Sequence, residues 1–456
     1  LPEPALTGTS TAPDGTALKS TPLYGSAKNA DCNNEELICS ASEKFELYQD
    51  GEICESDFEQ CYQTALKVLD RVIPETIQQG YTVSGLLITS QAQTFVPVDE
   101  DFNPLLKGIV WLDSRAKDEE KYLIEQLPDF QKTAGLSQPS SALYVSKLLW
   151  LKNNKPDIYK KARYFPLINE FIVYKLTGEF YSDYTNFGMG GLLNIREKVL
   201  NKQILDILNL SSDNFAEIKD AVSLFYNLKP ELKKRFDLKN DVPVYFCGND
   251  QSVSAAGAGI KRVGEISANF GTAMVVYTYL DNLPDVIAPY QMAGISPVAA
   301  EYFILSVETV GNIIDNVKNT CFPEISYDEF FSKYYIVKDI DLPDGLSVVN
   351  GKLSGLDGFD PGKKAGFTVK YFLNRFCFHL SQVEKQVKAE KLYISGGIAK
   401  SSVWIDLLKE NIDQQIILNN TREAGLIGAV KIYKKARLRG TPPAGAFAVP
   451  PAGFTR

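Results

Sequence analysis

The apolar residues in the first part of the chain are spaced as on one face of a helix. Between Glu55 and Gln79 they recur every three or four residues, which is the period of an α-helix. The next segment, Val83 to Thr89, is short and mostly apolar, so it predicts a buried strand. A helix that leads into a buried strand is typical of α/β proteins. The positions that define the predicted helix are Phe58, Cys61, Tyr62, Ala65, Leu66, Leu69 and Val72.

The rest of the chain continues this alternation of helical and extended patterns. An extended segment, a polar turn and a returning strand are predicted over 96–112, and helices over 114–127, 141–153 and 168–177, the last ending at Gly178. Further on, strands are predicted near residues 243, 265, 274, 302 and 392, and helices near 252, 309, 366, 402 and 423. Alternation of this kind predicts α/β layers, followed by a loosely ordered tail rich in Pro, Gly and Ala.

The composition is that of a soluble globular protein. Of the 456 residues, 45% are hydrophobic and 23% are charged, and the formal net charge is −8. Nucleic acids and anionic membranes need a clustered basic surface, so this acidic balance argues against both as partners. No apolar run approaches the roughly 20 residues that span a bilayer, and the N-terminal segment lacks the basic and apolar regions of a secretory signal. The sequence therefore predicts a cytoplasmic protein.

Cysteine usage fits reduced thiols better than a disulfide framework. The chain has seven cysteines, an odd number scattered over a large protein. Four of them lie close together in the sequence, but their spacings match no common zinc pattern. A metal or disulfide site among these four is the alternative to ordinary thiols. The four are Cys32, Cys39, Cys54 and Cys61.

The single histidine narrows the chemistry further. His379 lies in an apolar run, Phe376 to Leu380, which predicts a packing role on a helix. Catalytic triads built on histidine and metal sites with several histidines are therefore excluded. A general base in this protein is expected to be a carboxylate.

Three glycine-containing segments each follow a predicted strand. The first strand ends just before Asp250, which places one carboxylate where a strand changes to a helix. The second strand leads to Gly271 and Thr272, and the third to Gly396 and Gly397. Glycine lets backbone N–H groups approach an anionic phosphate closely. The three segments, in this order, predict a phosphate-handling enzyme.

These segments belong to an ordered set of motifs that resembles the FGGY carbohydrate kinases, the family of xylulokinase, ribulokinase, gluconokinase and glycerol kinase. The resemblance runs from about residue 55 to residue 435, and the order of its motifs makes it specific. The motifs are Ile88-Thr-Ser-Gln-Ala-Gln93, Gly108-Ile-Val-Trp-Leu-Asp-Ser-Arg115, Gly135-Leu-Ser, Lys147-Leu-Leu-Trp150, Leu176-Thr-Gly178, Ser182-Asp-Tyr-Thr-Asn186, Gly248-Asn-Asp-Gln251, Gly271-Thr272, Ser395-Gly-Gly-Ile-Ala399 with Trp404, and Glu423 with Gly428-Ala429.

The resemblance implies an α/β fold with two ribonuclease-H-like domains of the actin and hexokinase type, which flank a cleft for a sugar and ATP. We expect an N-terminal domain over 1–240, a C-terminal domain over 241–438 and a tail over 439–456. The implied reaction is ATP-dependent phosphorylation of a sugar hydroxyl, with ATP and Mg²⁺ as cofactors and a small sugar as partner. The motifs at 88–93 and 108–115 resemble the pentulose and gluconate branches more than the glycerol branch. A ketopentose of the xylulose or ribulose type is therefore the expected substrate.

Asp250 is the expected general base. Phosphoryl transfer needs the acceptor hydroxyl in line with the γ-phosphate, and usually a carboxylate that receives the hydroxyl proton. The alternative is that Asp250 only caps the helix that begins near Ser252. The other motifs favour the catalytic role.

The sugar is expected to contact polar and aromatic side chains of three motifs. Trp111 offers an aromatic face, Asp113 and Arg115 offer directional hydrogen bonds, and three glutamines, Gln91, Gln93 and Gln251, can both donate and accept. The alternatives are a core aromatic for Trp111 and a solvated helix start for Asp113 and Arg115. The resemblance implies nucleotide binding by Gly271, Thr272, Gly311, Gly396, Gly397 and Ala399, with simple tight turns as the alternative.

The N-terminus departs from the family pattern. FGGY kinases open with a strand, an aspartate and a phosphate loop, and Thr7-Gly-Thr-Ser-Thr11 resembles only that loop, with Gly8, Thr9 and Ser10 as its residues. The metal-coordinating aspartate has no clear counterpart, because Asp14 lies at the wrong place. A non-catalytic pseudokinase that binds a sugar or nucleotide is therefore the alternative function, and gluconate, glycerol and other polyols are alternative substrates. The metal ligands and the oligomeric state, a homodimer included, stay open.

Overall fold

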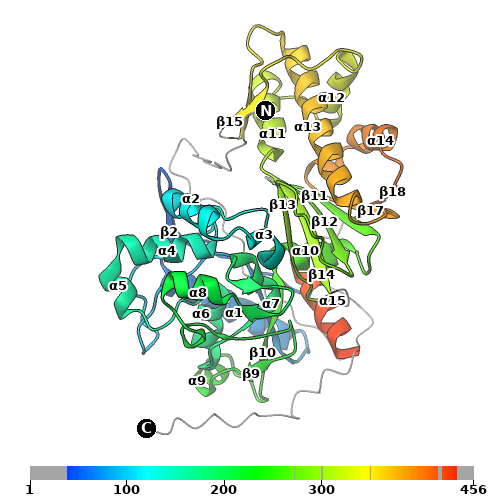
Figure 1. Ribbon diagram of the computed structural model, residues 1–456. Helices are drawn as coiled ribbons and strands as arrows, with labels where there is room; N and C mark the ends of the chain where they lie inside the picture. Colours follow the sequence, from blue (N-terminus) through cyan, green and yellow to red (C-terminus); the bar gives the residue numbers. More distant parts are fainter. Residues whose placement is uncertain (1–37, 272, 299–300, 350, 420–423, 439–456) are drawn as a thin grey trace.

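The strand that leads to Asp250, β10 (Pro243–Asn249), is the middle strand of a three-stranded sheet and is buried along its whole length. It runs parallel to β3 (Leu86–Ser90) and antiparallel to β9 (Phe225–Asn227). Strands covered on both faces are mostly apolar, which explains the sequence of β10, whereas the residues of β3 are only partly buried. The computed structural model describes residues 38–271, 273–298, 301–349, 351–419 and 424–438. This sheet belongs to the first of two lobes, drawn in blue to green in Figure 1.

Two helices predicted from sequence pack together in the first lobe. α1 (Phe58–Gln78) is capped by the preceding residue, Asp57, whose side chain accepts hydrogen bonds from N–H groups of the first turn of the helix. α6 (Ile168–Thr177) ends at Gly178 in the left-handed conformation, as predicted. The rings of Phe58 and Phe171 lie 5.5 Å apart at the contact between these helices. The predicted helix and strand near the start of the described chain are both confirmed.

The other elements of the first lobe are short. The predicted helices over 114–127 and 141–153 are confirmed as α2 (Lys117–Gln126) and α4 (Tyr144–Asn154). The predicted returning strand near 108 is β4 (Gly108–Ile109), and antiparallel bridges from Phe95 to Ile109 and from Val98 to Pro104 connect it to the extended segment before the turn. β4 also pairs with β2 of an unpredicted hairpin, β1 (Leu47–Asp50) and β2 (Ile53–Ser56). The remaining elements are α3 (Phe130–Ala134), α5 (Pro156–Lys161), β5 (Tyr181–Asp183), α7 (Tyr184–Phe187), the 3₁₀ turn Gly188–Gly190, β6 (Leu193–Asn194), β7 (Val199–Leu200), α8 (Lys202–Leu208), β8 (Glu217–Lys219) and α9 (Pro230–Arg235).

The second lobe is built on a six-stranded mixed sheet in the order β13-β14-β12-β11-β17-β18. The long helix α13 (Pro361–Glu384) packs against this sheet. Trp404 of α14 (Ser402–Asn411) is fully buried in the same core, and its ring lies 5.5 Å from that of Phe270. The strands are β11 (Glu265–Phe270), β12 (Met274–Leu280), β13 (Gln291–Ile295), β14 (Tyr302–Glu308), β17 (Lys391–Gly396) and β18 (Gln415–Leu418). The other elements are α11 (Gly311–Cys321), α12 (Tyr327–Ser332), the hairpin β15 (Ser347–Val349) and β16 (Lys352–Ser354), and α14 (Ser402–Asn411).

Two helices connect the lobes. α10 (Asp250–Ala258) continues directly from β10, and α15 (Ala424–Leu438) lies against it (Figure 1). A Cβ atom on Gly428 would lie only 1.6 Å from the carbonyl oxygen of Val253, so glycine is required for this close approach. A boundary between residues 240 and 241 would separate β10 from its partners β3 and β9, which belong to the first lobe. The domain limits stay predictions.

The structure also bears on the cysteines and the histidine. The six cysteines within the described ranges are free thiols, and those ranges contain no group of three or more His, Cys, Asp or Glu that could hold a metal. His379 is fully buried in α13, and its ring nitrogens contact Ser306 Oγ at 2.7 Å and Glu308 Oε2 at 2.8 Å. Several predicted features lie outside the described residues, namely Gly8, Thr9, Ser10, Asp14, Cys32, Thr272, Glu423 and the tail.

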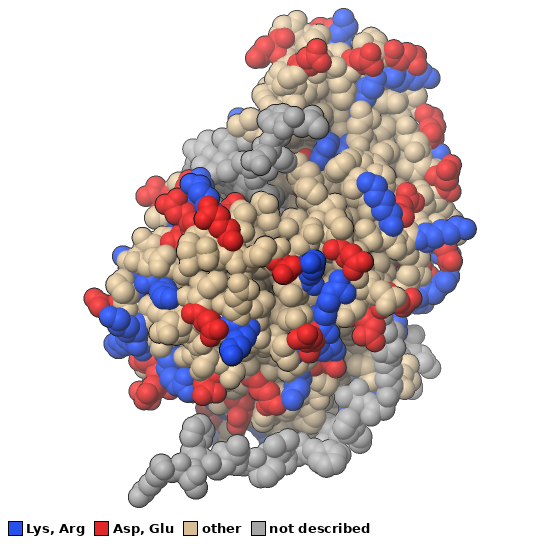
Figure 2. Space-filling model, in the orientation of Figure 1, with Lys and Arg blue, Asp and Glu red and all other residues tan. Residues whose placement is uncertain are grey.

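Charged residues of both signs are interspersed on the face shown in Figure 2. That face carries no continuous basic stripe of the kind that binds nucleic acid. Among the helices of the described chain, none has the length and apolar character needed to cross a membrane. The cytoplasmic location and the homodimer stay predictions.

Candidate functional site

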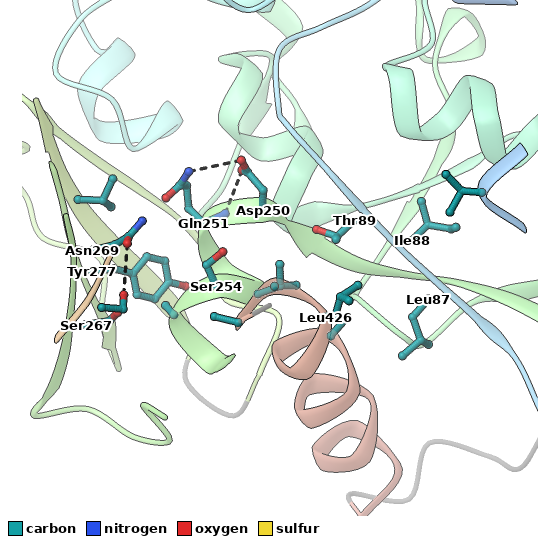
Figure 3. A pocket seen from close by; sticks show the side chains of 18 of the residues that line it. Leu87, Ile88, Thr89, Asp250, Gln251, Ser254, Ser267, Asn269, Tyr277 and Leu426 are labelled. Carbon is teal, nitrogen blue, oxygen red and sulfur yellow. Dashed lines mark hydrogen bonds between the residues drawn. The ribbon is translucent and has the colours of Figure 1, made fainter. Parts of the chain in front are cut away.

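Asp250 lies at the edge of a cavity of about 350 Å³ that is lined by residues of both lobes (Figure 3). The cap of α10 is the preceding residue, because Asn249 Oδ1 accepts the N–H of Ser252 at 2.8 Å. The alternative that Asp250 only caps this helix is therefore wrong. Its carboxylate is available to the cavity.

The surroundings of Asp250 favour a proton acceptor. Its Oδ1 accepts the backbone N–H of Gln251 at 2.9 Å, and its Oδ2 lies 3.4 Å from Gln251 Nε2. Burial raises the pKa of Asp250 to about 6, and the hydrogen bonds from Gln251 oppose that rise. A carboxylate with this pKa is ionised at neutral pH and still accepts a proton more readily than an ordinary aspartate. Asp250 and Gln251, two predicted site residues that are neighbours in the chain, both line this cavity.

The walls of this cavity come from distant parts of the chain. Figure 3 places Thr89 of β3 on one side of Asp250, and Asn269 and Tyr277 of the second lobe on the other. Apolar side chains of α1, β3, α6 and α15 line much of the remainder. The polar groups are concentrated around Asp250, where directional contacts with a ligand are needed.

A second cavity of about 580 Å³ brings together three of the predicted nucleotide-binding glycines, Gly271, Gly311 and Gly397. Gly311 begins α11, and the residue before it, Val310, provides no side-chain cap. The first N–H groups of an uncapped helix have no partner within the helix and favour an anion. The arrangement suits a phosphate group beside three residues without side chains.

The loop after β17 borders both cavities. Gly396 lines the first, and its φ of +106° together with a Cβ position only 2.3 Å from the carbonyl oxygen of Phe270 requires glycine there. Gly397 lines the second, and a Cβ atom on it would meet no atom within 4 Å. The alternative of a simple tight turn explains Gly396, but it does not explain Gly397. Ala399 is half-buried and lines neither cavity.

The polar residues of the second cavity were not predicted from the sequence. Tyr327 donates its hydroxyl hydrogen bond to Asp315 at 2.5 Å, and Asp328 accepts a hydrogen bond from Ser401. A Ser-x-x-Glu capping box at Ser326 marks the start of α12 in the sequence, but it carries no sign of a ligand. Only the fold brings these side chains to the glycines.

Two predicted sugar-binding segments are joined by one buried hydroxyl. Thr94 Oγ1 accepts hydrogen bonds from Gln91 Nε2 and from the backbone N–H of Trp111, both at 3.0 Å. The Trp111 side chain is 46% exposed, so the alternative of a core aromatic is wrong. Neither Gln91 nor Trp111 lines the two cavities described above. Thr94 carried no signal in the sequence.

Gln93 is linked to β10 through Met189. Its backbone has a φ of +66°, and its Nε2 donates to the carbonyl oxygen of Met189 at 3.0 Å. The Met189 sulfur in turn accepts from Asn249 Nδ2 at 2.9 Å. The loop that carries Gln93 is therefore fixed relative to the residue that precedes Asp250.

Asp113 and Arg115 contact each other instead of a cavity. Asp113 is fully buried and α2 begins only at Lys117, so the alternative of a solvated helix start is wrong. Nearby, Lys147 Nζ is also fully buried and donates to the carbonyl oxygen of Val110 at 2.7 Å. Burial lowers the pKa of Lys147 to about 7, and the charge of Asp113 opposes that change. This cluster supports the segment that carries Trp111.

Sequence comparison relates the chain to carbohydrate kinases. A sequence model of the N-terminal domain of the FGGY family of carbohydrate kinases matches residues 29–257. The chain is 21% identical over 424 residues to the xylulose kinase of Bacillus subtilis, covering 88% of this chain and 83% of that enzyme. It is also 21% identical over 395 residues to the glycerol kinase of Thermococcus kodakarensis, covering 81% of this chain and 78% of that enzyme.

Solved structures match the fold over most of the chain. The gluconate kinase of Lactobacillus acidophilus aligns with a TM-score of 0.79 at 19% identity, covering 89% of this chain and 86% of that one. The ligand-bound xylulose kinase of the same organism aligns with a TM-score of 0.78 at 19% identity, covering 91% of this chain and 87% of that one. At this identity the likeness establishes the two-domain actin and hexokinase type of fold.

Proposed function

Because the chain belongs to the FGGY family of carbohydrate kinases, we propose that it transfers the γ-phosphoryl group of ATP to a hydroxyl of a ketopentose of the xylulose or ribulose type. The observation that carries this proposal is the position of Asp250. It lines a cavity shared by both lobes, and Gly396 lines the same cavity while the adjacent Gly397 lines the second, glycine-lined one. A base and a phosphate-binding surface are thus neighbours.

Asp250 is the group that receives the proton of the sugar hydroxyl. As the hydroxyl oxygen bonds to the γ-phosphorus, the bond from that phosphorus to the oxygen of ADP breaks and ADP leaves. The hydroxyl proton passes to the Asp250 carboxylate. The hydrogen bonds from Gln251, at 2.9 and 3.4 Å, orient the carboxylate for this step.

The second cavity fits the nucleotide. Its volume of about 580 Å³, its three glycines and the uncapped start of α11 suit phosphate groups, and Asp315 and Asp328 can accept hydrogen bonds from ribose hydroxyls. Mg²⁺ bound with ATP would neutralise charge on the transferred phosphoryl group, and in such sites it is held largely by water and phosphate oxygens. The protein residues that complete its coordination stay open.

The sugar is assigned to the region bounded by Asp250, the 88–93 loop and Trp111. Gln91 and Gln93 each use an amide nitrogen in an internal hydrogen bond, which orients the two side chains in advance. The exposed Trp111 ring offers a face to the carbon skeleton. The choice of a ketopentose is supported by the xylulose kinases among the relatives, while the glycerol and gluconate kinases keep those substrates as alternatives.

The test is ADP release from Mg-ATP with xylulose, ribulose, gluconate, glycerol and erythritol, for the wild type and for Asp250→Asn. Sugar-dependent ADP release that is lost in Asp250→Asn is the expected result. Binding of a sugar or nucleotide without turnover would replace the kinase by the pseudokinase alternative. Turnover with gluconate or glycerol alone would keep the reaction and overturn the ketopentose.

A further inference from the structure

β10 contains an extra residue just before Asp250. Along the ladder with β3, Phe246 faces Ile88 and Asn249 faces Ser90, so two residues of β10 lie opposite the single residue Thr89. Such a bulge bends the strand and changes the direction of the side chains that follow. The bulge therefore sets the orientation of the strand end that carries the proposed base.

Gly248 gives this bulge its conformation. Its φ is +90°, which a residue with a Cβ rarely adopts. A Cβ atom there would also lie 3.0 Å from Thr185 Cγ2 and 3.3 Å from Pro297 Cβ. Glycine allows the bulge, but it contributes no side chain to fix it.

Thr89 supplies the bond that the interrupted ladder lacks. Its Oγ1 donates to the carbonyl oxygen of Gly248 at 2.8 Å, across 159 positions of the chain. Thr89 lies on β3 and lines the same cavity as Asp250 (Figure 3). The two residues that follow Gly248 are Asn249, the cap of α10, and Asp250 itself. A shift of the Gly248 carbonyl would therefore move the start of α10.

We propose that Thr89 is a positioning residue for Asp250, acting through the Gly248 carbonyl to hold the bulge in the orientation that directs the carboxylate at the sugar hydroxyl. The inference rests on the proposed kinase function. It assigns to Thr89 a role distinct from that of Thr94, whose hydroxyl accepts hydrogen bonds from Gln91 and Trp111 on the sugar side. Thr89 belongs to the 88–93 segment, but its hydroxyl bonds to Gly248 and not to the sugar-binding side chains proposed for that segment, Gln91 and Gln93. Thr89 should therefore affect turnover more than sugar binding.

Asp183, the last residue of β5, is a buried carboxylate near the same turn. Its Oδ1 accepts the N–H of Asn186 at 2.9 Å, and burial raises the pKa of Asp183 to about 6. The backbone N–H groups of Asn186, Thr185 and Gly248 oppose that rise. Among the described residues, the second carboxylate oxygen of Asp183, Oδ2, is buried without a hydrogen-bond partner. The hydrogen bond that the structure shows on Gly248 from a side chain is therefore the one from Thr89.

The kinetic test compares Thr89→Val, which removes the hydroxyl at nearly constant shape, with Thr89→Ser, which keeps it. With D-xylulose and Mg-ATP as probes, we expect Thr89→Val to lower kcat by about tenfold with both KM values within about twofold of the wild type, and Thr89→Ser to restore most of kcat. The matched control is Thr278→Val, since the buried Thr278 hydroxyl also donates to a carbonyl on a neighbouring strand, that of Glu265, at 2.8 Å. Its kcat should match the wild type.

A second measurement does not depend on turnover. Amide hydrogen exchange of a peptide covering residues 246–252 should be faster in Thr89→Val and unchanged in Thr89→Ser and Thr278→Val. If the wild type phosphorylates no sugar, the proposed function fails. The amide hydrogen exchange of residues 246–252 then decides by itself whether Thr89 holds the bulge. Should Thr89→Val not fold, Thr89→Ala removes the same hydroxyl.

Three results would overturn the positioning role. The first is a Thr89→Val variant whose kcat and amide hydrogen exchange equal those of the wild type. The second is a Thr89→Ser variant whose kcat is as low as that of Thr89→Val. The third is an equal loss of kcat in Thr278→Val, which would attribute the effect to general destabilisation.

Discussion

The carboxylate of Asp113 accepts hydrogen bonds from the guanidinium of Arg115 at 2.6 and 2.9 Å, inside the first lobe. The same carboxylate accepts the backbone N–H of Cys54 at 2.7 Å. Arg115 also reaches Glu55 at 2.8 Å and lies over the ring of Trp150. With these partners, Asp113 and Arg115 anchor the segment that presents Trp111. Their role is therefore to support the site and not to contact the sugar directly.

Replacing Asp113 by asparagine should therefore destabilise the protein. The variant leaves the nearly buried Arg115 without its main partner, and breaking a buried pair in this way costs about 3–5 kcal/mol. Urea unfolding measures the loss. The control is Asp129→Asn, whose pair with Lys132 is 70% exposed on both sides and should change stability by less than about 0.5 kcal/mol. A stable Asp113→Asn protein with a strongly raised sugar KM would instead make Asp113 a sugar ligand.

Turnover should depend on the ionisation of Asp250. Because its pKa is raised to about 6, the carboxylate is ionised above that pH and protonated below it. We expect kcat to be constant above about pH 7 and to fall about tenfold per pH unit well below pH 6. Asp250→Asn should be about 10²–10⁴-fold slower and lack this limb. An unchanged acid limb in the variant would assign the titration to another group.

Replacing the adjacent glycines Gly396 and Gly397 by alanine should affect different properties, stability in the first case and ATP binding in the second. Gly397→Ala should leave the unfolding free energy nearly unchanged, because its Cβ would meet no atom within 4 Å, and should raise the KM for ATP. Gly396→Ala should reduce stability by at least about 1 kcal/mol, because it combines a clash at 2.3 Å with a φ of +106°. Thermal unfolding and ATP kinetics of both variants separate the two effects. Equal ATP KM values for Gly397→Ala and wild type would remove Gly397 from the nucleotide site.

The two tryptophans Trp111 and Trp404 should separate binding from stability. Trp111→Ala should raise the KM for the sugar and change stability by about 0.5 kcal/mol or less, since its ring is 46% exposed. Trp404→Ala should cost about 3–5 kcal/mol, because that ring is fully buried in the second core. Urea unfolding and sugar kinetics on both proteins test this. A normal sugar KM in Trp111→Ala would exclude stacking on the sugar.

Stability should depend on pH through Glu170. Burial raises the pKa of this carboxyl to about 8, so its contribution is full below the unfolded value of 4.5 and is lost as the pH rises through 8. The wild type should lose on the order of a few kcal/mol more than Glu170→Gln between pH 5 and pH 9. The pKa of Lys147 is lowered to about 7, so its contribution to stability changes with pH in the opposite direction. That contribution is the same in both proteins and cancels when their stabilities are compared. Parallel stability curves would contradict the shift.

Helices and strands that depend on the residue pattern within one segment were predicted from the sequence. α1 follows from its helical spacing and β10 from its apolar run. Asp250 was predicted as the base because a single carboxylate stands where that strand ends, and its catalytic role stays a prediction. The β1–β2 hairpin, by contrast, was missed although its two-residue loop starts at Gly51 with a φ of +57°. A glycine at that position is a recognised hairpin signal, so this element was within reach of the sequence.

Side-chain partners across long distances had no such signal. An aspartate followed two residues later by an arginine can bind a sugar or form an ion pair, and only the fold shows that Asp113 and Arg115 contact each other. Thr94 and Thr89 belong to the same category, because their hydroxyl partners are chosen by tertiary packing. The residue types were therefore predictable, whereas their partners were not.

The link between Thr89 and Gly248 also has a consequence for how the protein is made. β3 leaves the ribosome long before its ladder partner β10, since the two ends of that link are 159 residues apart. At a synthesis rate of about 5–20 residues per second, this interval is roughly 8–32 s. An apolar strand without its partner is prone to aggregate during such a wait. The first lobe therefore lacks the middle strand of its sheet during this interval, and the cavity beside Asp250 is complete only after residues of the second lobe, such as Gly396, have been synthesised.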